Sequence, residues 1–289
     1  MTNTTQQQPA IESGLFSIGG ELPVYRLGFG AMRITGPGIW GEPKDRVEAL
    51  AVLRRSLDLG VNLIDTADAY GPDVSERLIA EALYPYPQGL VIATKGGLVR
   101  GGPDDWSPNG RPDHLRRALE GSLRRLRLDC IDLYQFHRPD PDVPLEESVG
   151  AISNLRNEGK IRFVGLSNVT TDQLQTAQGI VPIATVQNRY NLTDRESEDV
   201  LKACERDNIG FIPWFPLATG DLARPGGALD QMAKQHHATP SQLALAWLLK
   251  RSPVMLPIPG TSSVQHLEEN LEAARIELSQ DEFDQMESI

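Results

Sequence analysis

The chain has 289 residues, of which 40% are hydrophobic and 23% charged, and its formal net charge is -11. This length suits two average domains or one α/β barrel, and the acidic balance argues against non-specific binding to nucleic acid or to anionic membranes. The two cysteines, Cys130 and Cys204, lack metal-ligand spacing, so we expect neither a zinc site nor a disulfide scaffold, and we expect a reducing, cytoplasmic setting.

The first pattern in chain order is an alternation of apolar and polar residues around Gly19-Gly20, in segment 14–28. Such an alternation on both sides of a glycine pair predicts a β-hairpin. Residues 1–13 are polar and lack the apolar run of a signal peptide, so we expect a disordered tail there. No stretch of the chain reaches the roughly 18 apolar residues of a membrane span.

From residue 26 onward, short apolar runs alternate with amphipathic helical patterns. Strands are predicted at residues 26–30, 61–65, 90–95, 131–137, 161–167, 183–187, 209–215 and 254–259. Helices are predicted at residues 46–60, 74–83, 113–127, 145–159, 171–178, 195–206, 239–252 and 264–274. Because strands that alternate with helices pair in parallel, these units predict the α/β class: a (β/α)8 TIM barrel with an N-terminal β-hairpin at its bottom.

A doubly wound sheet is the rival architecture. It would usually carry a GxGxxG fingerprint after its first strand, where the glycines let the backbone approach a dinucleotide. The segment "GFGAMR" (28–33) has Arg33 in place of the third glycine, so the fingerprint fails. No linker rich in proline, glycine and serine divides the chain, which predicts one domain over residues 14–289.

Titratable side chains follow three of the predicted strands. Asp65 and Tyr70 follow the second strand, Lys95 ends the third and His137 ends the fourth. Alone, each has an ordinary explanation: a turn cap, a packing ring, a solvated lysine or a hydrogen-bonded core histidine. Together they would converge on the rim where barrels of this type build their active sites, so we interpret them as a catalytic set. Asp68 is interpreted as a turn residue.

The chemistry of these four groups is consistent with proton donation to an oxygen. A free tyrosine has a pKa of about 10, and a nearby ammonium favours the phenolate. We therefore expect Asp65 to keep Lys95 charged, Lys95 to lower the pKa of Tyr70, and His137 to orient the oxygen that Tyr70 protonates. If that oxygen is a carbonyl becoming an alcohol, the hydride must come from a cofactor, because no side chain supplies it.

Several segments resemble the aldo-keto reductase superfamily, over roughly residues 14–285. The matching segments are "NLIDTADAYG", "IATKGG", "DLYQFHRPD", "VGLSNV", "VQNRYNL" and "IPGTSSVQHLEENL". The resemblance implies NADPH-dependent reduction of aldehydes or ketones, with Tyr70 as the general acid and Asp65, Lys95 and His137 as its partners.

The resemblance also implies a set of cofactor-binding residues. Ser167, Asn168 and Gln187 would bind the nicotinamide carboxamide, and Trp214 would stack on the nicotinamide ring. Leu217 and Gly220 would lie along the pyrophosphate. The whole implied set is Gly30, Met32, Asp65, Ser167, Asn168, Gln187, Trp214, Leu217, Gly220, Gly260, Ser262, His266, Glu269 and Asn270.

The sequence departs from this family around the 2′-phosphate of NADPH. Many members place a lysine and an arginine there, whereas this chain has Gly260 and His266. NADPH is still the cofactor we expect, with NADH as the alternative, and a neutral His266 predicts a weaker, pH-dependent preference.

The substrate is expected to be a small carbonyl compound, in a pocket with Trp40 and Trp106 and with Arg100 nearby. Two tryptophans favour an apolar or aromatic substrate, although both rings could equally pack their own loops. The segments "GAMRITGPGIWG" and "IPWFPLATG" resemble the branch that includes bacterial pyridoxal reductases, which makes pyridoxal a candidate.

Two other functions stay open from sequence. A class I aldolase would use Lys95 as a Schiff base, and a non-catalytic subunit would bind the cofactor without turnover. The nicotinamide and adenosine segments disfavour the first, and the complete set of four disfavours the second.

Overall fold

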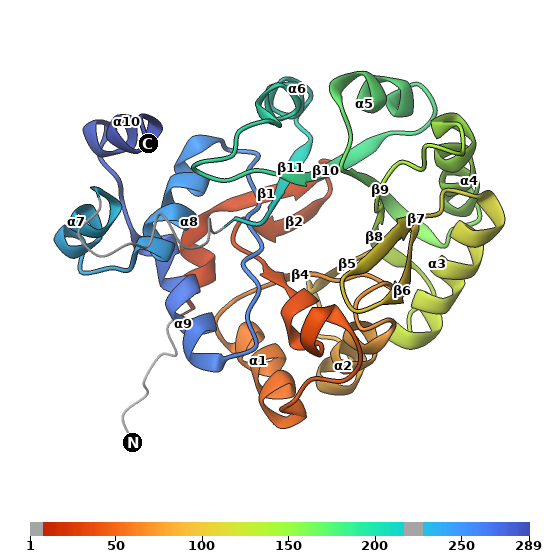
Figure 1. Ribbon diagram of the computed structural model, residues 1–289, viewed down its shortest axis with the longest axis horizontal. Helices are drawn as coiled ribbons and strands as arrows, with labels where there is room; N and C mark the ends of the chain where they lie inside the picture. Colours follow the sequence, from red (N-terminus) through yellow and green to blue (C-terminus); the bar gives the residue numbers. More distant parts are fainter. Residues whose placement is uncertain (1–7, 217–227) are drawn as a thin grey trace.

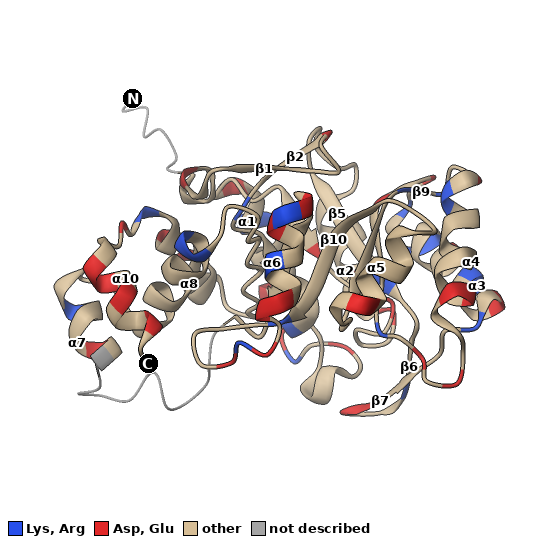
Figure 2. Ribbon diagram, turned by 90° about the horizontal axis from the view of Figure 1, so that it is seen from above, with Lys and Arg blue, Asp and Glu red and all other residues tan. Residues whose placement is uncertain are grey.

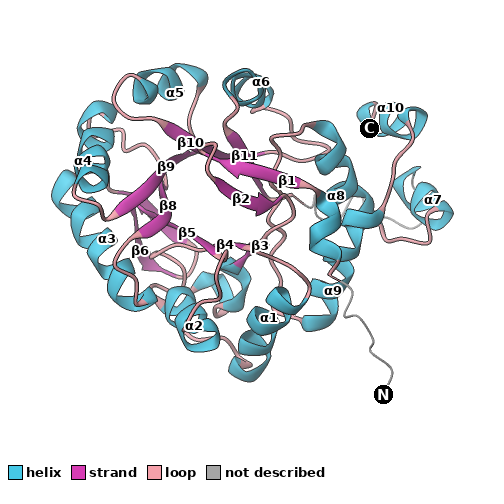
Figure 3. Ribbon diagram, turned by 180° about the vertical axis from the view of Figure 1, so that it is seen from behind, coloured by secondary structure: helices cyan, strands magenta, loops and turns pink. Residues whose placement is uncertain are grey.

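The computed structural model describes residues 8–216 and 228–289. Its central element is a curved parallel sheet with helices around its outside (Figures 1 and 3). Neighbouring strands, in spatial order, are β11 (Gly210–Trp214), β10 (Ile183–Arg189), β9 (Ile161–Ser167), β8 (Ile131–Phe136), β5 (Val91–Gly96), β4 (Leu63–Asp65) and β3 (Phe29–Gly30). The predicted α/β barrel is therefore confirmed, and the carboxyl ends of these strands share one rim.

The helices follow the predicted alternation. They are α1 (Arg46–Asp58), α2 (Val74–Leu83), α3 (Pro112–Leu126), α4 (Leu145–Asn157), α5 (Thr171–Gln178), α6 (Glu198–Asp207), α7 (Ala228–Gln235), α8 (Pro240–Arg251), α9 (Val264–Glu272) and α10 (Gln280–Glu287). Their starts follow capping chemistry: Thr170 and Thr239 each form a capping box, and Pro240 takes the first position of α8. In the described part of the chain, no helix is long and apolar enough to cross a membrane.

The prediction of an eighth regular strand at residues 254–259 is wrong. The segment lies between β11 and β3 and bonds to both, through Phe211 N to Val254 O (2.8 Å) and Gly28 N to Pro257 O (3.0 Å). Within this segment, the one regular β-bridge is an isolated pair between Phe211 and Met255. Pro257 and its neighbour Pro259 carry no N–H, so a continuous ladder cannot form although the segment fills the strand position.

The N-terminal hairpin is confirmed as β1 (Leu15–Ile18) and β2 (Leu22–Tyr25), which pair antiparallel. It lies over the amino ends of the barrel strands, where Glu21 pairs with Arg162 at 3.7 Å. In Figure 2 it lies at the opposite end of the molecule from strands β6 and β7.

The expectation of a disordered tail over residues 1–13 is wrong for Pro9–Ser13, which form a 3₁₀-helix. Ala10 is fully buried, and the Ser13 hydroxyl accepts a hydrogen bond from Leu27 N at 3.0 Å. Residues 1–7 lie outside the described part.

Three elements were not predicted. The loop after β5 contains a hairpin of β6 (Leu98–Gly102) and β7 (Asp105–Pro108), which projects from the active rim (Figure 2). Glycines at 96, 97, 101 and 102 hide the alternation that would indicate strands. Helices α7 and α10 lie outside the eight repeated units and flank α8 (Figure 1).

Candidate active site

Lys95 lies at the centre of the site, fully buried on β5. Its ammonium has three N–H donors, and all three are used. Nζ donates to Asp65 Oδ1 at 2.5 Å, to Thr66 O at 2.8 Å and to the Tyr70 hydroxyl oxygen at 3.3 Å. The structure thus brings together the carboxylate, ammonium and phenol that the sequence placed on two strand ends.

The second oxygen of Asp65 is also fully engaged. Oδ2 accepts from Gln135 Nε2 at 2.8 Å and from Gln187 Nε2 at 2.9 Å. Gly165, which pairs with Gln135 across the sheet, leaves room for that side chain, because a Cβ there would lie 2.8 Å from Gln135 Cγ. Gln135 was not predicted from the sequence as a site residue. It lies two residues before His137 and therefore points to the same side of β8.

Burial and the Lys95 ammonium have opposite effects on the pKa of the Tyr70 phenol. Desolvation raises the pKa of Tyr70 above its ordinary value, and the opposing effect of the Lys95 ammonium is smaller. The expectation that Lys95 brings this pKa below the ordinary value is therefore wrong, although its contribution has the expected sign. Desolvation lowers the pKa of Lys95, but Asp65 and Tyr70 together outweigh it, so the pKa lies above its ordinary value and the ammonium stays charged.

His137 follows β8 directly and is buried beside the phenol. Its ring meets that of Tyr70 edge to face, with centroids 5.8 Å apart. Desolvation, and then the charges of Lys95 and Arg138, hold its pKa well below 6.5, so the imidazole is neutral at neutral pH. Its Nδ1 is buried and has no hydrogen-bond partner among the described residues.

A chain of polar side chains links the ends of β9 and β11. Trp214 Nε1 donates to Asn168 Oδ1 at 3.0 Å. Asn168 Nδ2 donates to Ser167 Oγ at 2.9 Å and to His137 O at 3.0 Å. These contacts set Trp214, Asn168 and Ser167 beside the catalytic set, whereas the Gln187 amide turns toward Asp65.

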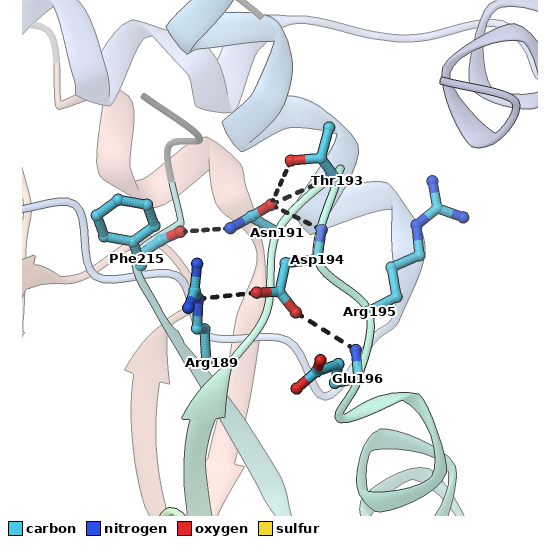
Figure 4. A pocket seen from close by; sticks show the side chains of 7 residues that line it. All are labelled: Arg189, Asn191, Thr193, Asp194, Arg195, Glu196 and Phe215. Carbon is cyan, nitrogen blue, oxygen red and sulfur yellow. Dashed lines mark hydrogen bonds and ion pairs between the residues drawn. The ribbon is translucent and has the colours of Figure 1, made fainter. Parts of the chain in front are cut away.

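Beyond Trp214 the loop after β10 encloses a cavity of about 410 Å³ (Figure 4). Its central charges are paired, because Arg189 Nε lies 2.8 Å from Asp194 Oδ2. Asn191 Nδ2 donates to Phe215 O at 3.2 Å, and the Arg189 guanidinium lies 5.8 Å from the Trp214 ring centroid. The loop therefore fixes the end of β11.

The other cofactor-binding residues that the resemblance implies are divided between two places. Met32, Gly260 and Ser262 line one cavity of about 540 Å³, together with Arg33 and Lys44. His266 is exposed in the first turn of α9, Glu269 Oε1 accepts from Gln265 Nε2 and Asn270 is buried. Gly30 ends β3 next to the cavity, and Leu217 and Gly220 lie outside the described residues.

Comparison with known proteins identifies the family to which this fold belongs. The model of the Aldo/keto reductase family matches residues 26–289. The chain belongs to the aldo/keto reductase family. It is thus an oxidoreductase that depends on a nicotinamide cofactor.

Relatives in this family span nearly the whole chain. An uncharacterized oxidoreductase from Schizosaccharomyces pombe is 54% identical over 274 residues, which cover 95% of this chain and 89% of the relative. A pyridoxine 4-dehydrogenase from Escherichia coli is 42% identical over 286 residues, with 96% and 99% covered. Among solved structures, an aldo/keto reductase from Klebsiella pneumoniae in complex with NADP and acetate has a TM-score of 0.81 at 30% identity, with 95% of this chain and 94% of that chain covered.

In this aldo/keto reductase, the two tryptophans and the arginine expected around the substrate form a row of contacts that begins at Tyr70. The Trp106 ring lies 6.3 Å from that of Tyr70, edge on, and the Arg100 guanidinium lies 3.5 Å from the Trp106 centroid. Trp40 lies on the same side, 5.6 Å from Arg100. Asp68 lies in a turn, as expected, but it is buried, and burial raises the pKa of its carboxyl well above the ordinary value.

Proposed function

We propose that this enzyme reduces aldehydes or ketones to alcohols with NADPH and that Tyr70 donates the proton. The observation that carries the proposal is the buried ammonium of Lys95, which contacts both Asp65 and the phenol oxygen. Since that oxygen accepts from Lys95, its own O–H is free to point toward a substrate. The ammonium would then stabilise the phenolate left after proton transfer.

The neighbouring residues have complementary tasks in this proposal. When bound, the reduced nicotinamide supplies the hydride. Neutral His137 would donate an N–H to the substrate oxygen and orient it without adding a charge. Gln135 and Gln187 hold the Asp65 carboxylate in place, so that Lys95 keeps its proton.

The residues present fit a nicotinamide. An amide, a hydroxyl and an indole ring lie at the ends of β9 and β11, and His137 Nδ1 is a buried polar atom without a partner in the described part of the chain. Asn168 and Ser167 would hold the carboxamide, and Trp214 would stack on the ring.

Arg33 and Lys44 support the choice of NADPH. Both line the cavity that contains Gly260 and Ser262, and the described residues hold no carboxylate within 4 Å of either charge. They would replace the cations that segment 260–266 lacks. Two acidic residues lie nearby: Asp45 lines the same cavity, and Glu48 Oε1 accepts from Val264 N at 2.8 Å at the start of α9.

Pyridoxal is the substrate candidate we propose. The Escherichia coli relative is a pyridoxine 4-dehydrogenase at 42% identity, and Trp40 and Trp106 provide aromatic surface beside Tyr70. The aldolase alternative is disfavoured, because a Schiff base needs a neutral amine, whereas all three N–H groups of Lys95 are engaged and its pKa is raised.

The test is a panel of aldehydes and ketones, including pyridoxal, assayed with NADPH and with NADH by nicotinamide absorbance. We expect NADPH to be consumed with at least one aromatic aldehyde and the matching alcohol to be formed. No consumption with any carbonyl compound, in protein that binds NADPH, would favour the non-catalytic subunit. Trapping of an imine on Lys95 with borohydride would favour the aldolase.

A separate prediction concerns the residues that give the preference for NADPH. Arg33→Ala should weaken NADPH binding roughly tenfold, from loss of one charge-assisted hydrogen bond worth about 1.5 kcal/mol. Both side chains are exposed, but Lys44→Ala should weaken NADPH binding less, because an ammonium binds a phosphate as a point charge whereas a guanidinium can bind it bidentately. Dissociation constants for NADPH and NADH, measured by fluorescence titration, give the result, and NADH binding should not change.

Arg54→Ala, on the exposed face of α1, is the matched control. The ratio of the dissociation constants for NADPH and NADH could change in His266→Arg and stay at the wild-type value in Arg33→Ala. In that case the phosphate lies at the first turn of α9, and the assignment to the 540 Å³ cavity is wrong.

A further inference from the structure

Arg100, on β6, uses every N–H of its guanidinium on backbone carbonyls. Nη1 donates to Ile39 O at 2.7 Å and to Ala69 O at 3.0 Å. Nη2 donates to Gly38 O at 2.9 Å and to Gly102 O at 3.0 Å, and Nε donates to Asp105 O at 3.0 Å. A guanidinium has five N–H groups, so none is left for a substrate.

The five carbonyls belong to three separate segments of the active rim. Gly38 and Ile39 precede Trp40, Ala69 precedes Tyr70, and Gly102 and Asp105 flank the turn of the β6–β7 hairpin. Gly38 and Ile39 have φ values of 65° and 54°, in the left-handed region. Their carbonyl groups also accept backbone N–H groups, Gly38 O from Asp104 N at 3.1 Å and Ile39 O from Gly71 N at 3.2 Å. Arg100 therefore adds a second donor to each carbonyl and reinforces backbone bonds that already link the three segments.

Two routes lead from Arg100 to Tyr70. Through the backbone, Arg100 holds the Ala69 carbonyl, while Tyr70 N donates to Ala67 O at 3.2 Å. The peptide between Ala69 and Tyr70 is therefore held on both sides. Through side chains, the flat guanidinium lies 3.5 Å from the centroid of Trp106, whose ring meets Tyr70 at 82°.

We propose that Arg100 is a positioning residue for the reaction. It joins the three rim segments into one preformed wall and sets the direction of the Tyr70 phenol, and it does not bind an anionic group of the substrate. The inference rests on the proposed reductase function. It differs from the expected role of a rim arginine, which is to capture a carboxylate or phosphate.

Lysine cannot replace arginine in this position. An ammonium has three N–H groups and is not planar, so it can neither reach five carbonyls in one plane nor stack on Trp106. Arg100→Lys should therefore behave like Arg100→Met, even though it keeps the charge. That comparison separates geometry from electrostatics.

The experiment measures kcat and KM with benzaldehyde and with 4-carboxybenzaldehyde for wild type, Arg100→Lys and Arg100→Met. Arg54→Lys and Arg54→Met, on the outer surface of α1, are the matched controls. We expect kcat to fall roughly 10- to 100-fold with both aldehydes in both Arg100 variants, because a small misplacement of a catalytic group costs that much. NADPH binding should not change, which also shows that the variants are folded.

A loss confined to 4-carboxybenzaldehyde, and seen in KM, would show that Arg100 binds the carboxylate and would overturn the proposal. Wild-type kcat in Arg100→Lys would also overturn it, because charge alone would then suffice. If wild-type protein reduces neither these aldehydes nor any other in the panel, the reductase function itself fails. That result is distinct from unchanged kcat in the variants of an active enzyme.

Discussion

Two buried ion pairs lie on opposite faces of β5. Lys95 points into the barrel and pairs with Asp65, whereas the preceding residue, Thr94, points outward and donates to Glu76 Oε1 at 2.6 Å. Glu76 is fully buried on α2 and pairs with Arg125 of α3 at 2.6 Å. Each pair joins two elements, and in each pair at least one of the charged side chains is fully buried.

The difference lies in the remaining contacts of each cation. The third hydrogen of Lys95 goes to a phenol that can still release its own proton. Arg125 instead contacts a second carboxylate, Asp73, at 3.2 Å and the Ser122 hydroxyl at 3.4 Å. A buried ion pair therefore does not itself indicate a catalytic site; what matters is whether it contacts a group that can react.

Lys95→Met should produce the largest effect. The variant removes the ammonium that stabilises the Tyr70 phenolate, so turnover should fall by at least the roughly 10²–10⁴-fold typical of lost acid catalysis. It also leaves Asp65 without its cation, and breaking a buried pair costs about 3–5 kcal/mol of unfolding free energy. Turnover per NADPH-binding site and unfolding in urea measure the two losses.

Arg125→Met is the matched control for this variant. It should lower the unfolding free energy by about 3 kcal/mol, because it leaves Glu76 buried without a cation, and turnover per folded molecule should stay at the wild-type level. Full activity of Lys95→Met at any pH, or equal loss of turnover in both variants, would remove the distinction between the two pairs.

A smaller effect concerns His137 and pH. Its pKa is well below 6.5 in the folded protein, so below pH 6.5 the unfolded chain binds a proton that the folded chain does not. The unfolding free energy should therefore decrease as pH falls below about 6.5, by up to about 1.4 kcal/mol per pH unit from this residue. His137→Gln should remove that share of the slope in urea unfolding between pH 5 and 7 (an assay range); an unchanged slope would show that His137 does not stay neutral.

Sequence reasoning succeeded where local pattern and tertiary packing agree. The helices over 74–83 and 171–178 and the strand over 161–167 match the structure residue for residue. The four titratable residues could be grouped because parallel strands bring their ends to one rim, and the structure places them around Lys95.

It failed where prolines interrupt a segment that otherwise looks like a strand, and where burial or a distant residue decides the outcome. Pro257 and Pro259 keep segment 254–259 from forming a regular strand even though neighbours hold it in the strand position. The net pKa of Tyr70 depends on burial, which a motif does not show. Arg33 was noted as a defect in a glycine motif, and only the folded chain places it beside Gly260.

The most direct test of the account is hydride transfer from NADPH carrying deuterium at both C4 positions of its nicotinamide, followed by mass spectrometry of the alcohol formed from an aromatic aldehyde. Wild-type protein should place deuterium on the former carbonyl carbon, and Tyr70→Phe should bind the cofactor with similar affinity but form product roughly 10²–10⁴ times more slowly. Deuterated alcohol formed by Tyr70→Phe at the wild-type rate, with hydride transfer shown to be rate-limiting, would contradict the role of Tyr70 as the proton donor. Alcohol without deuterium would contradict reduction by the cofactor.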